Sequence, residues 1–379
     1  MDKAKVSMKV PVCEASIGEE ELRNVTDCVK SGWISGYKGK YIDQFEQEFA
    51  RYCGAKHGIT TTSCATALLL SLETLGVGAG DEVITTDFTM LATVAAIVRA
   101  RAKPVLVDVE RDTWCVDPEL IERAVTARTR AIMPVPIYGH PVDVEAIRGI
   151  ADRYGLLVIE DAAEAIGSEY ADGKRVGSAF DAACFSFYIN KMISTGEGGM
   201  VLTSDDDLAV QLHRMKGYDT DPENRFIHKR LGFNYRMTNL AASVGCAQIQ
   251  KIDGFLAKKR HIAKFYENRL GKLDVTLPAE RIGCRNSYWV YAIVLPTGYD
   301  RDQIIGKLAE MGVETRRFFH PMHLQPALRK YVDNWGVTWD GSFPVSVDIG
   351  RHGLYLPNGV TLTDEQLDYT CKRLEKVLG

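Results

Sequence analysis

Several features that define common protein classes are missing from this sequence of 379 residues. Its nine cysteines include no Cys-x-x-Cys pair, the usual spacing of a zinc site or a redox dithiol. No uninterrupted run reaches about 18 apolar residues, so a membrane span is not expected. The polar N-terminus lacks the apolar core of a secretory signal. We therefore expect a cytoplasmic protein whose thiols are reduced and mostly buried.

An excess of basic charge is also missing. The 46 Lys and Arg residues are outnumbered by 50 Asp and Glu residues, which gives a formal net charge of −4. A broad basic surface for nucleic acid is therefore not expected. The sequence also has no internal repeat and no low-complexity segment, so repeat proteins and disordered chains are excluded.

What is present is an alternation of helical stretches and short apolar runs between Ala65 and Thr203. Several runs are continuously apolar, as is typical of strands covered on both faces by helices. The sequence therefore predicts an α/β fold with a mainly parallel sheet. The predicted strands are Asp81–Thr85, Pro104–Val109, Ala131–Ile137, Leu156–Glu160, Ala183–Tyr188 and Gly199–Thr203.

A smaller second lobe is expected after the first. We place residues 1–250 in a large domain with an N-terminal arm and residues 251–379 in a small C-terminal α/β domain. Between the elements of the large domain, the polar segment Gly217–Gly232 has no clear period and is predicted to be a functional loop. The elements expected near and beyond the boundary are helical structure from Asn239 to about Gly271, strands Tyr288–Leu295 and Gly312–Phe319, helix Asp300–Met311 and a last helix from Thr363 to Leu378.

Two charged residues follow predicted strands of the large domain. Asp161 comes directly after the run Leu156–Glu160, and Lys191 follows the run Ala183–Tyr188. Ligands of open parallel sheets bind at the carboxyl ends of strands, and a buried carboxylate needs a cationic partner. These two residues are a structural ion pair, solvated loop residues or part of a site.

A third feature suits a phosphate group. The small residues Thr62 to Thr66 open a helix after a short strand-like segment, and the free N–H groups of a helix N-terminus bind anions. Ser186 adds a hydroxyl five residues before Lys191. A lysine amine, a buried carboxylate and a phosphate site together suggest pyridoxal phosphate, which needs a Schiff-base lysine and a carboxylate at its pyridine nitrogen.

Two other motifs would indicate a dinucleotide site or a metal site, but each is less well supported than the pyridoxal phosphate site. The glycines Gly76, Gly78 and Gly80 lack the G-x-G-x-x-G spacing of a dinucleotide site and precede a strand. His320 and His323 would suggest a metal pair, but Pro321 lies between them and no third ligand is apparent. Loop packing or substrate contact is the better interpretation of these histidines.

The sequence resembles the sugar aminotransferases of the DegT/DnrJ/EryC1/StrS family, which are fold-type I pyridoxal phosphate enzymes. The resemblance implies a large domain with a mainly parallel, seven-stranded type of sheet. Within the family it points to 4-aminotransferases that act on nucleotide-linked 4-keto-6-deoxy sugars. The segments that carry it are 32–50, 78–97, 107–121, 136–144, 158–170, 185–203, 231–249 and 314–326.

The resemblance also implies residue roles. Lys191 would be the Schiff-base lysine, Asp161 the partner of the pyridine nitrogen, and Glu164 a neighbour of the phenolic oxygen of the cofactor. Asn234 would reach the phosphate from a second subunit, which implies a homodimer with shared active sites. The remaining cofactor contacts would be Cys64, Ala65, Thr66, Met90 and Ser186.

Four positions differ from the usual family pattern. Ala65 interrupts the S-G-T or S-C-T motif at the helix start, and Met90 replaces an aromatic residue that often stacks on the pyridine ring. Ile166 stands where histidine is usual, and Arg317 replaces a proline. With Ala65, one hydroxyl contact to the phosphate is either missing or supplied by Thr66. A thioether packs on a ring with less stacking energy than an aromatic group.

The predicted reaction takes the amino group of L-glutamate, releases 2-oxoglutarate and aminates C4 of a nucleotide-linked 4-keto-6-deoxy sugar. GDP-linked 4-keto-6-deoxymannose is the leading acceptor, followed by UDP- and dTDP-linked 4-keto-6-deoxyglucose. A 3-keto sugar aminotransferase remains an alternative. A related 3-dehydratase has histidine in place of Lys191, and a sensor protein would need a DNA-binding segment that this sequence lacks.

Contacts to the acceptor are expected from Tyr, Arg and His residues. The loop Gly217–Gly232 would supply cationic donors to the diphosphate of the acceptor. These loop residues are Arg225, His228, Lys229 and Arg230. Further substrate contacts are expected from Tyr37, Arg236, Arg316 and His320.

Overall fold

The computed structural model describes residues 8–37, 39–221, 223–224, 226–335 and 342–379. Its main feature is a seven-stranded sheet in the order β1-β7-β6-β5-β4-β2-β3. Strands β6, β5, β4, β2 and β3 run parallel to their neighbours in that order, and β7 is antiparallel to both β1 and β6. The mainly parallel sheet predicted from the sequence is confirmed. The strands are β1 His57–Thr61, β2 Glu82–Thr86, β3 Lys103–Val107, β4 Thr129–Met133, β5 Leu157–Asp161, β6 Ala182–Ser186 and β7 Gly199–Thr203.

Successive side chains of these strands enter two different hydrophobic clusters. Val158 and Phe185 pack with Phe45 and Phe49 of α2 on one face, whereas Ile159 and Cys184 pack with the leucines of α3 on the other. Alternation of this kind is the geometry of a strand with both faces buried. The helices of this part are α1 Glu19–Ser31, α2 Lys40–Cys53, α3 Cys64–Thr74, α4 Leu91–Arg99, α5 Pro118–Arg123, α6 Val144–Tyr154, α7 Asp206–Met215 and α8 Asn239–Ile249.

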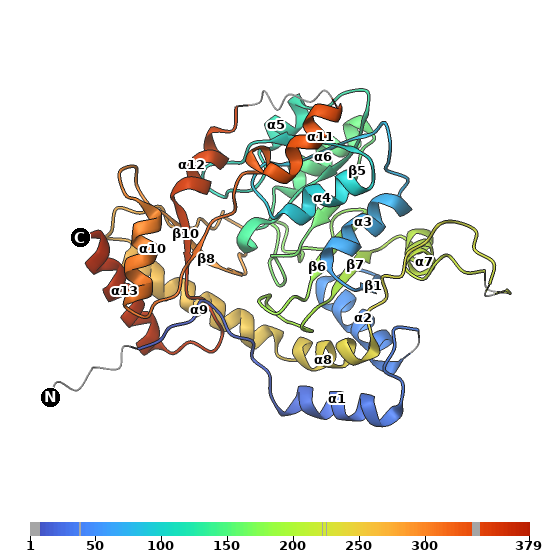
Figure 1. Cartoon of the computed structure of the whole chain (residues 1–379), viewed down its shortest axis with the longest axis horizontal. Coiled ribbons are helices and arrows are strands. Elements are labelled where there is room, and N and C mark those ends of the chain that lie inside the picture. Colours follow the sequence, from blue (N-terminus) through green and yellow to red (C-terminus); the bar gives the residue numbers. More distant parts are fainter. Residues whose placement is uncertain (1–7, 38, 222, 225, 336–341) are drawn as a thin grey trace.

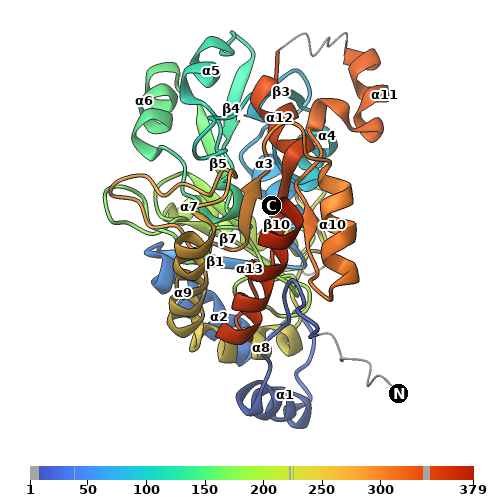
Figure 2. The same cartoon turned by 90° about the vertical axis from the view of Figure 1, so that its left-hand side faces the viewer.

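The second lobe is built on the long helix α9, Ile252–Leu270. Its three-stranded antiparallel sheet has the order β8-β10-β9, and helices α10 and α13 lie beside it, away from the large sheet (Figures 1 and 2). Thr363 caps α13 in a reciprocal capping box with Gln366, as its sequence suggests. The remaining elements are β8 Tyr291–Val294, α10 Arg301–Glu310, β9 Arg316–Arg317, α11 Pro326–Trp335, α12 Pro344–His352, β10 Gly353–Leu356 and α13 Asp364–Leu378.

Two segments cross between the lobes. Val10, near the N-terminus, forms a parallel bridge with Val313 and is buried in the core of the second lobe. Conversely, Phe343, just before α12, and Leu328 of α11 pack against Val94 of α4, so that α11 lies near α4 at the top of Figure 1. The domain boundary at residue 250 therefore remains a proposal, because side chains from both sides of this boundary contribute to the hydrophobic core of each lobe.

Buried acids hold the second of these segments in place. Asp87, just after β2, accepts hydrogen bonds from the backbone and ring of His323 at 2.8 and 2.7 Å and from the Ser346 hydroxyl at 2.7 Å. Asp108, just after β3, accepts the first N–H groups of α12, from Val345 and Ser346, at 2.9 Å each. A carboxylate at a helix N-terminus is favoured by the exposed N–H groups and the helix dipole. His323 is thus a packing residue, tied to the end of a strand.

Candidate active site

The carboxyl ends of β5 and β6 bring the two predicted charged residues together. The strands are parallel neighbours, and Asp161, the last residue of β5, pairs with Cys184 of β6. The chain leaves β6 at Ser186 and reaches Lys191 within one short loop. Parallel strands end at the same edge of a sheet, so the spacing of these residues in sequence places both at one site.

The Lys191 amine is buried between an aromatic ring and a carboxylate. Its Nζ lies 3.5 Å from the centroid of the Trp289 ring and 3.9 Å from Oε1 of Glu164. Burial lowers the pKa of Lys191, and the charges of Glu164 and Asp161 act in the opposite direction. Burial therefore favours the neutral amine, which is the nucleophilic form of lysine.

Three donors surround the Asp161 carboxylate. The Thr93 hydroxyl donates to Oδ2 at 2.7 Å, the Ala163 N–H donates to Oδ1 at 3.3 Å, and the Cys64 thiol lies 3.6 Å from Oδ1. Burial raises the pKa of Asp161, while the Thr93 hydrogen bond is the largest of the effects that lower it. The hydroxyl thus helps to keep a buried carboxylate ionised.

Glu164 is the third ionisable group of the site. Its Oε2 accepts the backbone N–H of Tyr138 at 2.9 Å, and Tyr138 adopts a left-handed backbone with φ of 54°. Burial raises the pKa of Glu164 to about 7, although the charge of Lys191 opposes the rise. Near neutral pH this carboxyl therefore exists in both protonation states and is able to accept or donate a proton.

The N-terminus of α3 lies next to the start of β7. Ser63 caps α3, and Thr66 returns its hydroxyl to the backbone of Ser63 in a reciprocal cap. A Cβ atom on Gly199 would lie 2.3 Å from the carbonyl carbon of Ser63, so only glycine allows this close approach. The Thr66 hydroxyl is thus used by the helix cap, and backbone N–H groups are the main donors that this helix end offers an anion.

The residues present fit pyridoxal phosphate. The cofactor needs an amine for its aldehyde, a carboxylate for its pyridine nitrogen and donors for its phosphate. Lys191, Asp161 and the N-terminus of α3 supply these groups on neighbouring elements of one sheet edge. Ser186, whose hydroxyl accepts only a long 3.4 Å contact from the Tyr188 N–H, lies at the same edge.

Other predicted site residues lie at the surface of this chain. Met90 is the N-cap of α4; its sulfur accepts the Ala92 N–H at 3.0 Å, and the residue is 52% exposed. Asn234 is exposed, and its amide oxygen accepts hydrogen bonds from the Arg236 guanidinium at 2.9 and 3.2 Å. Tyr37 is 78% exposed. Arg236 and Tyr37 line one hollow of about 750 Å³ between the segments 36–46 and 213–236.

The loop Gly217–Gly232 projects beyond α7 at the right of Figure 1. Within it, Arg230 donates to the buried Asp219 at 2.8 Å, and Lys229 pairs with Asp221 at 3.1 Å. The His228 ring contacts the Tyr218 carbonyl at 3.0 Å. The fourth predicted loop residue, Arg225, lies outside the described residues. The cationic side chains that are described therefore already have partners within the loop.

The segment 314–320 borders the second lobe. Arg316 is exposed and pairs with Glu314, and Arg317 pairs with Asp302 at 2.8 Å. His320 is exposed. Ile166, where the family usually has histidine, is buried in the main core. A hydrophobic side chain at that position therefore serves packing.

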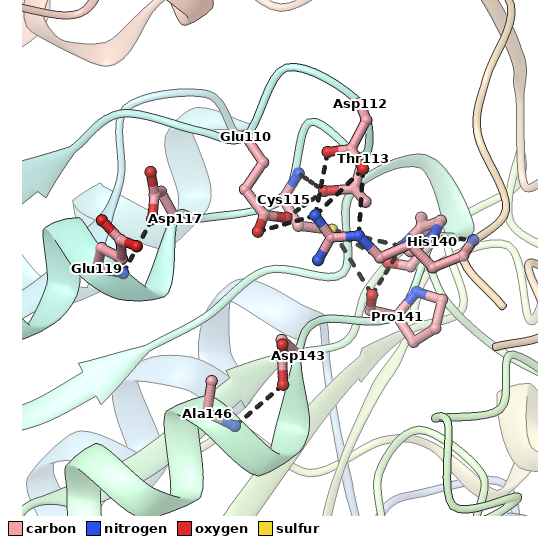
Figure 3. Close-up of polar contacts among 11 residues, drawn as sticks. Glu110, Asp112, Thr113, Cys115, Asp117, Glu119, His140, Pro141, Asp143 and Ala146 are labelled. Carbon is pink, nitrogen blue, oxygen red and sulfur yellow. Dashed lines mark hydrogen bonds and ion pairs between the residues drawn. The ribbon is translucent and has the colours of Figure 1, made fainter. Parts of the chain in front are cut away.

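Two segments that carry the family resemblance, 107–121 and 136–144, make contacts that mainly hold the fold together. Figure 3 shows Asp117 and Asp143 accepting N–H groups of Glu119 and Ala146 at the starts of α5 and α6. His140 is buried, with Nδ1 2.7 Å from the Pro141 carbonyl, and burial lowers its pKa. These contacts stabilise the turns that carry Trp114 and Tyr138, whose rings are in contact. The Tyr138 N–H in turn holds the Glu164 carboxylate in place.

Sequence reasoning missed three residues that contact the predicted ones: Thr93, Tyr138 and Trp289. Thr93 lies inside an apolar helix, where a threonine usually has no special function. Trp289 precedes a strand of the other lobe, almost 100 residues after Lys191 in the chain. No local pattern marks either residue, because each acts through a contact made only in the folded chain.

Comparison with known proteins agrees with this geometry. A model of the DegT/DnrJ/EryC1/StrS aminotransferase family matches residues 15–375. The chain is 40% identical over 374 residues to GDP-perosamine synthase of Caulobacter vibrioides, covering 98% of each chain. It is 37% identical over 364 residues to GDP-perosamine synthase of Vibrio cholerae, covering 96% of this chain and 97% of the relative.

Solved structures agree as well. DesV of S. venezuelae, in complex with a ketimine intermediate, is 32% identical and superposes with a TM-score of 0.90, covering 97% of this chain and 98% of DesV. Fold and site together define an aminotransferase. The chain belongs to the DegT/DnrJ/EryC1/StrS aminotransferase family. Membership implies pyridoxal phosphate as the cofactor. No helix in the described part of the chain is long and apolar enough to cross a membrane.

Proposed function

We propose that this protein is a pyridoxal phosphate-dependent aminotransferase that moves the amino group of L-glutamate to C4 of a nucleotide-linked 4-keto-6-deoxy sugar. The observation that carries the proposal is the buried Lys191 amine. It lies beside Glu164, and the charge of Asp161 also acts on its pKa. The similarity to two GDP-perosamine synthases supports the choice of acceptor. GDP-linked 4-keto-6-deoxymannose is the first candidate.

Each site residue has a proposed task toward the cofactor. Lys191 would hold the aldehyde carbon, and Asp161 would hold a proton on the pyridine nitrogen. Glu164 would face the phenolic oxygen, and Met90 would pack on the ring. Ser186, together with the α3 residues Cys64, Ala65 and Thr66, would surround the phosphate. When bound, the cofactor supplies an electron sink for the carbon that loses or gains the amino group.

The proton movements of the reaction fall to Lys191. Once its Nζ is free, the amine would take a proton from the substrate carbon that bears the nitrogen and deliver it on the cofactor side of that nitrogen. Its lowered pKa favours the neutral form required for the first step. The Trp289 ring covers the amine and excludes water from one side.

The alternatives weighed on the sequence are less well supported. A 3-dehydratase of this family has histidine at the position of Lys191, so the lysine argues for amino transfer. A sensor protein does not need a buried lysine and two buried acids poised at one strand edge. Amination of a 3-keto sugar would use the same residues, and the choice of carbon is decided by the acceptor test below.

We further propose a homodimer in which Asn234 of one subunit completes the site of the other. The exposed loops around Asn234 and Tyr37 carry an unusual amount of apolar surface, which favours burial against another protein surface. Asn234 itself is solvent-exposed and bonded only to its neighbour Arg236 among the described contacts. The exposed apolar residues of these loops include Trp33, Ile34, Tyr37, Phe226, Ile227 and Leu231.

The acceptor is tested with a panel of keto sugar nucleotides. With glutamate as donor, mass spectrometry should show the amino product from GDP-linked 4-keto-6-deoxymannose, and NMR should place nitrogen on C4. Turnover of UDP- or dTDP-linked 4-keto-6-deoxyglucose alone would keep the reaction type and change the nucleotide. Amination of only 3-keto sugars, or of only simple 2-oxo acids, would overturn the proposed substrate.

Removing the Thr93 hydroxyl should weaken the hold of the protein on the cofactor. Thr93→Val keeps the side-chain shape but removes the 2.7 Å hydrogen bond to Asp161, so the pKa of Asp161 should rise further. A hydrogen bond to a charged group contributes about 1.5–3 kcal/mol, which sets the upper limit of the expected loss of cofactor affinity. Fluorescence titration with pyridoxal phosphate at several pH values measures it. Thr93→Ser retains the hydroxyl and is the control; equal affinities for the two variants would contradict the role.

A further inference from the structure

A small pocket adjoins the buried lysine on the side of the second lobe. Its volume is about 230 Å³, and its walls include Asn190, Trp289, Lys259, Arg316 and Tyr355. Asn190 directly precedes Lys191, and the Trp289 ring lies 3.5 Å from the Lys191 amine. Lys191 itself does not line the pocket, but its chain neighbour Asn190 and the Trp289 ring that covers its amine both do.

Lys259 gives this pocket a positive charge that the protein does not neutralise. The side chain is buried, and its Nζ donates to two backbone carbonyls, those of Trp289 at 2.8 Å and Asn358. Within the described part of the chain, no carboxylate pairs with it. The buried Lys216, in contrast, pairs with Glu46 at 2.9 Å. Burying an unpaired cation is costly, and burial accordingly lowers the pKa of Lys259 to about 8.

Arg316 adds a second cation at the same pocket. Its guanidinium pairs with Oε1 of Glu314, whose other oxygen accepts the Val12 N–H at 3.0 Å. A guanidinium has five N–H donors, so one carboxylate oxygen leaves most of them available. The Arg316 side chain is 56% exposed, which allows it to move toward a ligand.

Asn190 provides an uncharged partner. Its buried Oδ1 has no hydrogen-bond partner in the described structure. A buried amide that is not tied to protein groups is free to turn its N–H donors toward a ligand. The pocket thus presents two cations and an adaptable amide, a donor set that matches a carboxylate.

We propose that this pocket binds the distal carboxylate of the amino donor, with Lys259 and Arg316 as its cationic contacts. The proposal rests on the proposed function, since it specifies how a dicarboxylic donor is chosen there. The pocket is smaller than the roughly 300–1,000 Å³ of sites that enclose larger ligands, so a nucleoside diphosphate does not fit within it. The side-chain carboxylate of an acidic amino donor at the reacting centre would enter this pocket past the Trp289 ring.

The test measures binding without catalysis. Calorimetric titration of the cofactor-loaded protein with glutarate, a five-carbon dicarboxylate, is compared with titration of pentanoate, which has one carboxylate. Glutarate should bind more tightly to the unaltered protein. Arg316→Gln and Lys259→Met should each raise its Kd at least about tenfold, as for loss of a charged hydrogen-bond donor, and reduce the preference for glutarate over pentanoate.

Arg317→Gln is the matched control. Arg317 is the neighbour of Arg316 on β9, pairs with Asp302 and does not line the pocket, so glutarate affinity should be unchanged. Because Lys259→Met also removes two internal hydrogen bonds, the exposed Arg316 keeps the test decisive if that variant does not fold.

Two results would overturn the proposal: equal binding of glutarate and pentanoate by the unaltered protein, or equal glutarate affinity in the Arg316 and Arg317 variants. Intact glutarate selectivity with no amino transfer to any sugar nucleotide would instead count against the proposed function alone.

Discussion

Lys191→Ala should abolish amino transfer and the covalent attachment of the cofactor. The unaltered protein should be yellow after loading with pyridoxal phosphate, and borohydride should fix the cofactor to the peptide that contains Lys191. The alanine variant should keep weakened, non-covalent binding through the phosphate donors near α3 and Ser186. Peptide mapping by mass spectrometry and the visible absorbance spectrum measure these outcomes.

The size of this effect follows from the environment of the amine. Burial lowers the pKa of Lys191 and so favours its uncharged form. Lys191 also lies at the same edge of the sheet as the buried acid Asp161. Lys174 is a suitable control, because it is exposed and pairs only with Asp172, so Lys174→Ala should retain colour, adduct and activity. A borohydride-fixed adduct on any lysine other than Lys191 would show that the site is assigned to the wrong residue.

Mixing two inactive variants should restore activity if the sites are shared between subunits. In a heterodimer of Lys191→Ala and Asn234→Ala chains, one site carries both changes and the other carries neither. Activity should therefore return to at most about half of the normal value per dimer, provided that the subunits exchange. Turnover assays after denaturation and joint refolding measure the recovery.

The separate variants and the oligomeric state control this experiment. Each variant refolded alone should stay inactive or nearly so, and sedimentation should show a dimer in every case. An active monomer, or no recovery from dimers that demonstrably exchange subunits, would contradict the shared site.

The sheet and its charged edge could be predicted because they depend on local patterns. Continuous apolar runs predicted the parallel strands, and Gly199–Thr203 has the predicted bounds of β7. Asp161 and Lys191 were found because a charge directly after a buried strand needs an explanation. The roles assigned to them remain predictions for the experiments above.

Features made by distant contacts could not be predicted in this way. β10 is only four residues long, and both of its partner strands, β8 and β9, lie in other segments of the chain. Its sequence is therefore too short for a periodic pattern, and no adjacent turn marks it as part of a hairpin. Lys259 looks like any lysine on an amphipathic helix, and only packing against Trp289 and Asn358 buries it. The specificity pocket is thus invisible to sequence periodicity, which reports one element at a time.

The pairing of Val10 with Val313 has a consequence for synthesis. Val10 leaves the ribosome well before its partner, because Val313 is synthesised about 300 residues later. At roughly 5–20 residues per second, the early segment waits on the order of 15–60 seconds before its place exists. During that time the large sheet can form, but the second lobe cannot close. The nascent chain therefore presents the segment around Val10 unpaired until Val313 has been synthesised.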